Sequence, residues 1–224
     1  MRKLIKNELS GWKTWEVIWL GLACLIITVL SIYWGDNVMG IVSATTGVAC
    51  VVLTGKGKLS AYLFGLVNCV LYAIIAWQAK YYGEVTFNAI SIPLQIIGFI
   101  TWSKHMNTET YEVEKKRMST NGRWLLVLTI VVSTVVYGFI LKAIGGKMPF
   151  VDGFTTATSL IAMIISIKMF SEQWYLWCII NLLSIVLWIG NIMTGTDNWA
   201  TFMMWLTYLM NSIIMLVKWE KEAR

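Results

Sequence analysis

Long apolar runs separated by short polar connections dominate the chain. Eight mostly apolar stretches of about 17–20 residues can be distinguished, and at about 1.5 Å of helical rise per residue each is long enough to cross a bilayer core. They cover approximately residues 15–34, 38–54, 59–77, 85–102, 124–141, 153–170, 174–193 and 199–218. Because a helix satisfies its own backbone hydrogen bonds in lipid, we predict an all-α transmembrane protein with eight helices.

The composition supports this class. Hydrophobic residues make up 58% of the 224 residues and charged residues only 13%, whereas about a quarter of a soluble domain is charged. The four cysteines all lie inside apolar runs without a Cys-x-x-Cys pair, so we interpret them as buried apolar side chains rather than metal ligands. We therefore expect membrane lipid as the surroundings, and neither a metal nor another cofactor.

The net charge of +6 reflects membrane orientation rather than binding to nucleic acid, because the basic residues lie in connections between apolar runs. With the N-terminus inside, all but three of the 18 Lys and Arg residues fall on the inner side, the exceptions being Lys80, Lys142 and Lys147. This asymmetry predicts a protein of the bacterial cytoplasmic membrane with both termini in the cytoplasm. A signal peptide is the alternative for the first run, but we find no small-residue cleavage site after it.

An internal repeat appears when the chain is shifted by 113 residues. The matches, found without a gap, are Gly40 with Gly153, Ala44 with Ala157, Thr45 with Thr158, Tyr62-Leu63 with Tyr175-Leu176, Asn68 with Asn181, and the acids Glu84 and Asp197. The second to fourth helices would form one unit and the sixth to eighth the other. A single intervening helix makes the two units parallel, an architecture of transporters that bind their substrate between the halves.

We accordingly divide the chain into four parts. Residues 1–35 hold an N-terminal tail and an extra helix, and residues 36–103 form the first three-helix repeat. Residues 104–148 hold a cytoplasmic loop and the linker helix, and residues 149–224 form the second repeat with a cytoplasmic tail. The expected arrangement is two parallel three-helix repeats joined by a linker helix (3+1+3), plus the extra N-terminal helix.

Polar side chains inside the predicted spans mark the candidate binding site, because they are costly in lipid unless they face protein, water or substrate. They recur at helical spacing on single faces. The sets are Asn68 with Tyr72, Asn88 with Ser91 and Gln95, Trp174 with Trp177 and Asn181, and Tyr208 with Asn211. Interhelical hydrogen bonding is the alternative for any one of them, but their concentration in the repeated units favours a shared substrate pathway.

Trp174 and Trp177 share a helix face with Asn181. Aromatic faces can hold a flat ring and attract a cation, whereas membrane anchoring at a helix end is the alternative for these indoles. Amide and phenol groups nearby could bind hydroxyl groups of the same ligand. The residues thus predict a flat, hydroxyl-bearing and cationic small molecule as the substrate.

The sequence lacks the residues that proton coupling, ATP hydrolysis or enzymatic catalysis would require. The predicted spans hold no buried Asp, Lys or Arg that could relay protons, and we find neither a phosphate-binding loop nor a hydrolase motif. The segment from Thr54 to Lys58 is a tight basic turn. Pro93 should bend the fourth helix near the polar face. A uniporter without a catalytic residue fits best, and sodium coupling through neutral oxygens stays open.

These residues resemble the PnuC-type nicotinamide riboside transporters. The resemblance lies in Trp174-x-x-Trp177-x-x-x-Asn181, in Tyr82-Gly-Glu-x-x-x-Asn88 followed by Pro93, Gly98 and Trp102, and in the helix count, and it extends from residue 36 to residue 218. It implies facilitated diffusion of a vitamin precursor that phosphorylation traps inside, a fold similar to that of SWEET transporters, and a homotrimer. The family's substrates include nicotinamide riboside, thiamine and deoxynucleosides. One departure is that Phe64-Gly65 stands where a tryptophan pair would complete the clamp in the third helix.

Two rival functions remain at this point. A membrane-embedded enzyme would need a cluster of acids, bases or metal ligands, for which only Glu84 and Asp197 at the outer mouth are candidates. A scaffold subunit would not need so many aligned polar residues. Our prediction is uptake of nicotinamide riboside, with thiamine or a deoxynucleoside as alternatives.

Overall fold

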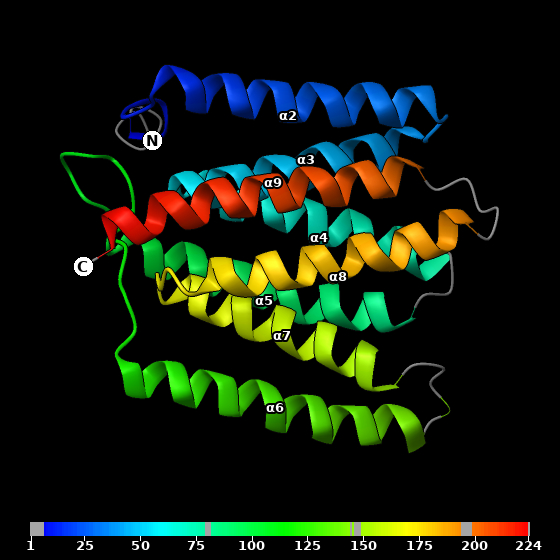
Figure 1. Cartoon of the computed structure of the whole chain (residues 1–224). Coiled ribbons are helices and arrows are strands. Elements are labelled where there is room, and N and C mark those ends of the chain that lie inside the picture. Colours follow the sequence, from blue (N-terminus) through cyan, green and yellow to red (C-terminus); the bar gives the residue numbers. More distant parts are fainter. Residues whose placement is uncertain (1–6, 79–81, 144, 146–148, 194–198, 224) are drawn as a thin grey trace.

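The computed structural model describes residues 7–78, 82–143, 145, 149–193 and 199–223, and its described part is almost entirely helical. The long helices are α2 (Thr14–Tyr33), α3 (Val38–Lys56), α4 (Ser60–Gln78), α5 (Tyr82–Ser103), α6 (Thr120–Ala143), α7 (Pro149–Ile167), α8 (Gln173–Met193) and α9 (Trp199–Glu222). They coincide with the eight predicted runs and lie side by side along one axis (Figure 1). The predicted all-α fold is therefore confirmed.

Two helix ends differ from the prediction because they are set by residues outside the predicted apolar runs. Helix α7 begins at Pro149, four residues before the predicted start, because proline suits the first position of a helix. Helix α3 ends at Lys56 and is capped by Gly57, whose φ of +80° is left-handed, and Lys58 N–H donates to the Leu53 carbonyl at 3.0 Å. This cap turns the chain directly into α4.

Six of these helices are long and apolar enough to cross a membrane, namely α2, α3, α5, α6, α7 and α9. The apolar stretches described in α4 and α8 are shorter, Ser60–Ile75 and Gln173–Val186. The chain is thus a multi-pass membrane protein. The two shorter stretches are the helices that carry Asn68 and Asn181, near the middle of the bundle.

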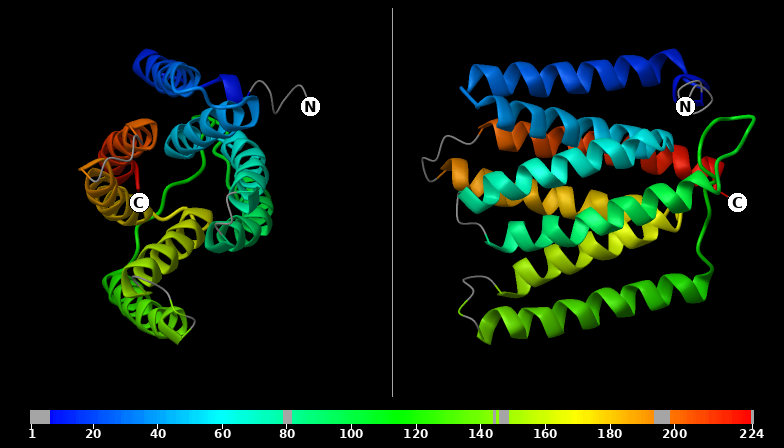
Figure 2. Two further views of the ribbon diagram at one scale, coloured as in Figure 1. Left: turned by 90° about the vertical axis from the view of Figure 1, so that its right-hand side faces the viewer. Right: turned by 180° about the vertical axis from the view of Figure 1, so that it is seen from behind.

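Six helices close into a ring. Helices α3, α4, α5, α7, α8 and α9 pack in the order α4–α3–α9–α8–α7–α5, and α5 returns to α4. The end-on view in Figure 2 shows this ring, with α2 and α6 outside it on opposite sides. Helix α2 packs against both α3 and α9, while α6 packs against α7.

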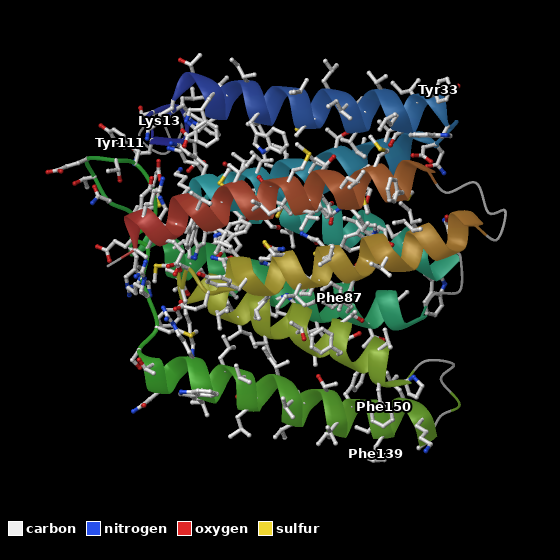
Figure 3. The ribbon with its side chains drawn as sticks, viewed as in Figure 1. Lys13, Tyr33, Phe87, Tyr111, Phe139 and Phe150 are labelled. Atoms are coloured by element: carbon white, nitrogen blue, oxygen red, sulfur yellow. The ribbon has the colours of Figure 1, made fainter. Side chains whose placement is uncertain are left out.

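The contact between α6 and α7 is close because Gly138 has no side chain. The Phe150 ring occupies the space that a Cβ on Gly138 would need, and it meets the Phe139 ring edge to face at 5.4 Å between centroids (Figure 3). The rest of α6 presents apolar side chains outward, as a helix facing lipid does. Helix α6 therefore lies at the periphery of the bundle.

The segment 104–119 covers the end of the bundle where the termini lie (Figures 1 and 3). Val113 N–H donates to the Gly57 carbonyl at 2.9 Å, and Lys116 N–H donates to the Met169 carbonyl at the same distance. The segment is thereby tied to the turn after α3 and to the turn after α7. The largest buried cluster, which includes Trp102, Trp174 and Trp219, lies at this end.

Candidate functional site

A cavity of about 260 Å³ lies inside the ring and is lined by side chains from all six ring helices. Its volume is close to the lower end of the range of about 300–1,000 Å³ for small-molecule sites. The lining residues that the argument uses are Gly47, Tyr62, Gly65, Asn68, Cys69, Phe87, Asn88, Ser91, Gln95, Ser159, Ser166, Trp174, Trp177, Asn181, Trp205, Tyr208 and Ser212. Neither α2 nor α6 contributes to it.

Eight of the ten residues predicted to contact substrate line this cavity, and they come from four helices. They are Asn68 of α4, Asn88, Ser91 and Gln95 of α5, Trp174, Trp177 and Asn181 of α8, and Tyr208 of α9. The remaining two, Tyr72 and Asn211, do not line it. The geometry therefore brings together polar faces that the sequence could only assign to separate helices.

Asn68 and Asn181, which match when the sequence is shifted by 113 residues, are held by hydrogen bonds to adjoining ring helices. Asn68 Nδ2 donates to the Ser43 carbonyl at 2.7 Å, and Asn181 Nδ2 donates to Ser212 Oγ at 2.8 Å. Ser212 Oγ in turn donates to the Tyr208 carbonyl at 2.8 Å. Each amide is thus oriented by its neighbour, as preorganised binding requires.

Gln95 enters the cavity wall because position 65 is a glycine. A Cβ at Gly65 would lie 2.5 Å from Gln95 Nε2, so any larger residue would displace the amide. Gln95 Nε2 also lies 3.9 Å from Cys69 Sγ. The departure of Phe64-Gly65 from a tryptophan pair therefore has a physical consequence, since it makes room for an amide rather than an indole.

Tyr62 and Trp174, which line the cavity, pack against further aromatic rings. The Trp174 and Trp219 rings meet at 5.9 Å between centroids, and the Tyr62 and Trp102 rings at 5.0 Å, both edge to face. Trp102 Nε1 donates to the Ser166 carbonyl at 3.1 Å, and Trp219 Nε1 donates to the Gly55 carbonyl at 2.7 Å. Trp174 is only 2% exposed, which is inconsistent with membrane anchoring.

Tyr72 and Asn211 lie elsewhere. Tyr72 is 41% exposed on α4. Asn211 Nδ2 donates to the Val51 carbonyl at 3.1 Å, and its Oδ1 accepts from Trp19 Nε1 at 3.1 Å. Asn211 thus joins α9 to α3 and to α2, and Ser212, the next residue, faces the cavity instead. Interhelical bonding, the alternative considered for any single amide, describes Asn211.

Sequence reasoning missed Tyr62, Trp205 and Ser212, which also line the cavity. For α9 a signal existed, because Trp205, Tyr208 and Ser212 follow the same i, i+3, i+7 spacing as the predicted face of α8. Ser159 of α7 lines the cavity as well. The acid pair suggested for an outer mouth cannot be placed, because the Glu84 side chain and Asp197 lie outside the described residues.

No Asp, Glu, Lys, Arg or His is among the described residues that line the cavity. The described part of the chain also holds no group of three His, Cys, Asp or Glu side chains that could bind a metal. A second cavity, of about 310 Å³, lies between α5, α6 and α7. Its lining is apolar apart from hydroxyl groups, so the inner cavity with its amides is the candidate site.

The charged side chains gather instead at the end of the bundle that holds the termini. There the ion-pair cluster consists of Glu16, Lys56, Glu112 and Lys218, with each acid paired to both lysines. Lys56 Nζ lies 2.5 Å from Glu112, and Lys218 Nζ lies 2.8 Å from Glu16. Burial by itself would raise the pKa of Glu112, but Lys115 and Lys218 outweigh it and lower that pKa to about 2.

The basic turn after α3 points both of its lysines inward. Lys58 Nζ donates to the carbonyls of Asn7, Ser10 and Tyr111 at 2.9, 2.6 and 2.7 Å. Lys56 belongs to the ion-pair cluster and also donates to the Gly11 carbonyl at 2.6 Å. The turn therefore fastens the N-terminal segment and segment 104–119 to the bundle, and neither ammonium group is left for a phosphate.

Comparisons with known proteins match this chain over nearly its whole length. A family described as nicotinamide mononucleotide transporter matches residues 37–221, which include α3 to α8 and most of α9 but not α2. The nicotinamide riboside transporter PnuC of Neisseria mucosa is 38% identical over 98% of this chain and 86% of its own length. The protein of the same name from Haemophilus influenzae is 34% identical over 99% of this chain and 96% of its own.

A solved structure is similar as well. The crystal structure of the vitamin B3 transporter PnuC superimposes with a TM-score of 0.85 at 35% sequence identity, covering 98% of this chain and 96% of that one. The likeness therefore includes α2, which the family match leaves out.

Proposed function

Since the chain belongs to the nicotinamide mononucleotide transporter family, we propose that it carries nicotinamide riboside across the bacterial cytoplasmic membrane. The observation that supports this substrate best is the neutral cavity lined by aromatic and amide side chains. A pyridinium ring can lie against indole and phenol rings, and ribose hydroxyl groups can bond to amides. Members of this family are transporters rather than enzymes.

The lining favours the riboside over its phosphate ester. The family's description names the mononucleotide, whereas the two relatives compared above are named for the riboside. A phosphate group in this cavity would be a buried anion without a cation among the described lining residues, which costs a large free energy. The same argument explains trapping, because a riboside phosphorylated in the cytoplasm would no longer fit the route by which it entered.

Transport would proceed by facilitated diffusion, with the two halves of the ring moving relative to each other. We propose that residues 36–103 and 149–224 are the parallel repeats, with 1–35 and 104–148 as the extra helix and the linker. The order of the ring agrees with this division, because α5 packs on α7 and α9 packs on α3. Both contacts join the third helix of one unit to the first helix of the other. This is the pattern expected if an axis along the membrane normal relates the two units.

The orientation with both termini in the cytoplasm is also part of the proposal. It rests on the distribution of Lys and Arg, which gather at the end of the bundle where the termini and segment 104–119 lie. A reporter fused to the C-terminus that is active only in the cytoplasm would test this orientation.

The test of the function is binding to the purified full-length protein in detergent, measured by calorimetry. Nicotinamide riboside should bind in the micromolar range or tighter, and the mononucleotide should bind at least a hundredfold more weakly. Thiamine and deoxyadenosine, the alternatives left by the sequence, are measured in parallel. Equal affinity for the riboside and the mononucleotide would contradict the argument from the neutral cavity. If thiamine alone binds, the substrate is thiamine and not nicotinamide riboside.

A further inference from the structure

The two proposed repeats meet along two seams of the ring, α3 with α9 and α5 with α7. Each seam has an indole hydrogen bond near the end of the bundle that holds the termini. Across the first seam, Trp219 Nε1 of α9 donates to the Gly55 carbonyl of α3 at 2.7 Å. Across the second seam, Trp102 Nε1 of α5 donates to the Ser166 carbonyl of α7 at 3.1 Å. The two seams are thus alike at this end, and they differ in what lies beside them.

Helix α2 lies over the α3–α9 seam and is bonded to both of its sides (Figure 2). Its Glu16 pairs with Lys56 of α3 and, at 2.8 Å, with Lys218 of α9. All three side chains are almost fully buried. Removing one partner from such a buried pair is costly, because it leaves a charge without compensation.

The contact continues along α2. Trp19 Nε1 donates to Asn211 Oδ1 of α9 at 3.1 Å, and Asn211 Nδ2 donates to the Val51 carbonyl of α3 at 3.1 Å. Closer to the other end of the bundle, Thr28 Oγ1 lies 2.8 Å from Thr45 Oγ1 of α3. Apolar side chains pack between these bonds, and the buried ones are Ala23, Ile27, Val48 and Val52. Helix α2 is therefore a clamp that holds α3 and α9 together.

The α5–α7 seam is flanked by a cavity instead. This second cavity, of about 310 Å³, lies between α5, α6 and α7. Ser133 and Tyr137 of α6 line it together with Ile90 of α5, so the outer helix faces α5 across a space. Phe87 of α5 lines both this cavity and the central one, and its side chain thus belongs to the wall between them. Side chains beside a cavity have room to move that close-packed side chains lack.

The cost of opening each seam follows from these contacts. Parting α3 from α9 would break both bonds of Asn211, divide the ion pairs of Glu16 and expose the apolar cluster beneath α2. Parting α5 from α7 would break the bond of Trp102 and enlarge a space that already exists. A buried donor that loses its acceptor costs free energy, and so does apolar surface that becomes exposed. Movement is therefore easier at the α5–α7 seam.

We propose that the α3–α9 seam, held by α2, is the hinge of transport, and that the α5–α7 seam is the one that opens. The two repeats rotate about an axis near α2 and do not rock equally on both seams. Helix α2 thereby has a function, although it contributes none of the described residues that line the central cavity. This inference rests on the proposed function, since it takes the movement of the two repeats as the means of transport.

The test tethers one seam at a time and measures the initial uptake of radiolabelled nicotinamide riboside by proteoliposomes that contain the full-length protein. The α3–α9 pair is Gly55→Cys with Met215→Cys, because a Cβ on Gly55 would lie 2.3 Å from Met215 Cγ and a disulfide is within reach. The α5–α7 pair is Ile90→Cys with Leu160→Cys, which line the second cavity from both helices and are joined by a short bifunctional thiol reagent. The single-cysteine variants receive the same treatment as controls for the native cysteines, and reduction reverses each tether.

The α3–α9 disulfide should leave uptake within about twofold of the reduced protein, whereas the α5–α7 tether should lower it about tenfold or more until it is reduced. Equal losses at both seams would indicate symmetric rocking and overturn the proposal. A loss at α3–α9 alone, or no loss at either seam, would overturn it as well. If the unmodified protein takes up no riboside, the proposed function itself fails.

Spin labels give a second measurement that needs no tether and that decides the question if a tethered variant does not fold. Val42→Cys with Met210→Cys reports on α3 and α9, and both side chains are exposed. Ile97→Cys with Ile164→Cys, also at exposed positions, reports on α5 and α7. The distance between labels should be the same with and without riboside for the first pair and should take a second value for the second pair. A change across α3–α9, or an unchanged distance across α5–α7, would overturn the proposal.

Discussion

Replacing Glu112 by glutamine removes one acid of the ion-pair cluster while keeping the shape of the side chain. Glu112 lies in segment 104–119 and pairs with Lys56 at 2.5 Å and Lys218 at 3.4 Å. It also pairs with Lys115 at 2.5 Å. Because Lys56 ends α3 and Lys218 belongs to α9, the substitution weakens the contact between two ring helices at the end with the termini.

The magnitude follows from the pKa of Glu112, which the surrounding lysines lower from 4.5 to about 2. At about 1.4 kcal/mol per unit, the difference corresponds to at most about 3.5 kcal/mol of stability at neutral pH. A carboxyl group whose pKa is lowered in the folded state contributes this stability above pH 4.5 and loses it as the pH falls toward 2. Less than half, about 1.4 kcal/mol, should remain at pH 3.

The assay is thermal unfolding in detergent, followed by tryptophan fluorescence, at pH 7 and at several values down to pH 3. Glu112→Gln should lower the midpoint by about 6–12 °C at pH 7, and the difference from the unmodified protein should shrink below pH 4.5. Glu109→Gln, in the exposed part of the same segment, is the control and should change little. A midpoint within 1 °C of the unmodified protein at pH 7, or a difference that stays constant with pH, would refute the reasoning.

Three further substitutions separate binding from stability. Gly65→Ala should push the flexible Gln95 side chain into the cavity and weaken riboside binding about tenfold by calorimetry; Gly21→Ala, with nothing within 4 Å of its new Cβ, should not. Asn181→Leu should abolish most uptake while the protein stays folded, and unchanged uptake kinetics would remove the site assignment. Asn211→Leu should instead lower the stability by about 1–3 kcal/mol in thermal unfolding, because two bonds between helices are lost, and should leave the binding constant unchanged.

The helices could be predicted from the sequence because their cause is local. An apolar run of sufficient length must form a helix in lipid wherever its neighbours lie, since the backbone has no other way to satisfy its hydrogen bonds there. The spacing of Asn88, Ser91 and Gln95, or of Trp174 and Asn181, likewise follows from the helical period. These properties belong to single segments, and each could be read without knowing the rest of the molecule.

The direction in which each face points was decided only by the tertiary structure. Asn68 and Tyr72 are four residues apart on one helix, yet Asn68 lines the cavity and Tyr72 is exposed, because the neighbouring ring helices cover only part of that face. Helices α2 and α3 similarly surround Asn211 and leave the cavity to Ser212. The partners of Asn211, Val51 and Trp19, are 160 and 192 positions away in the chain, and no local pattern can encode such contacts.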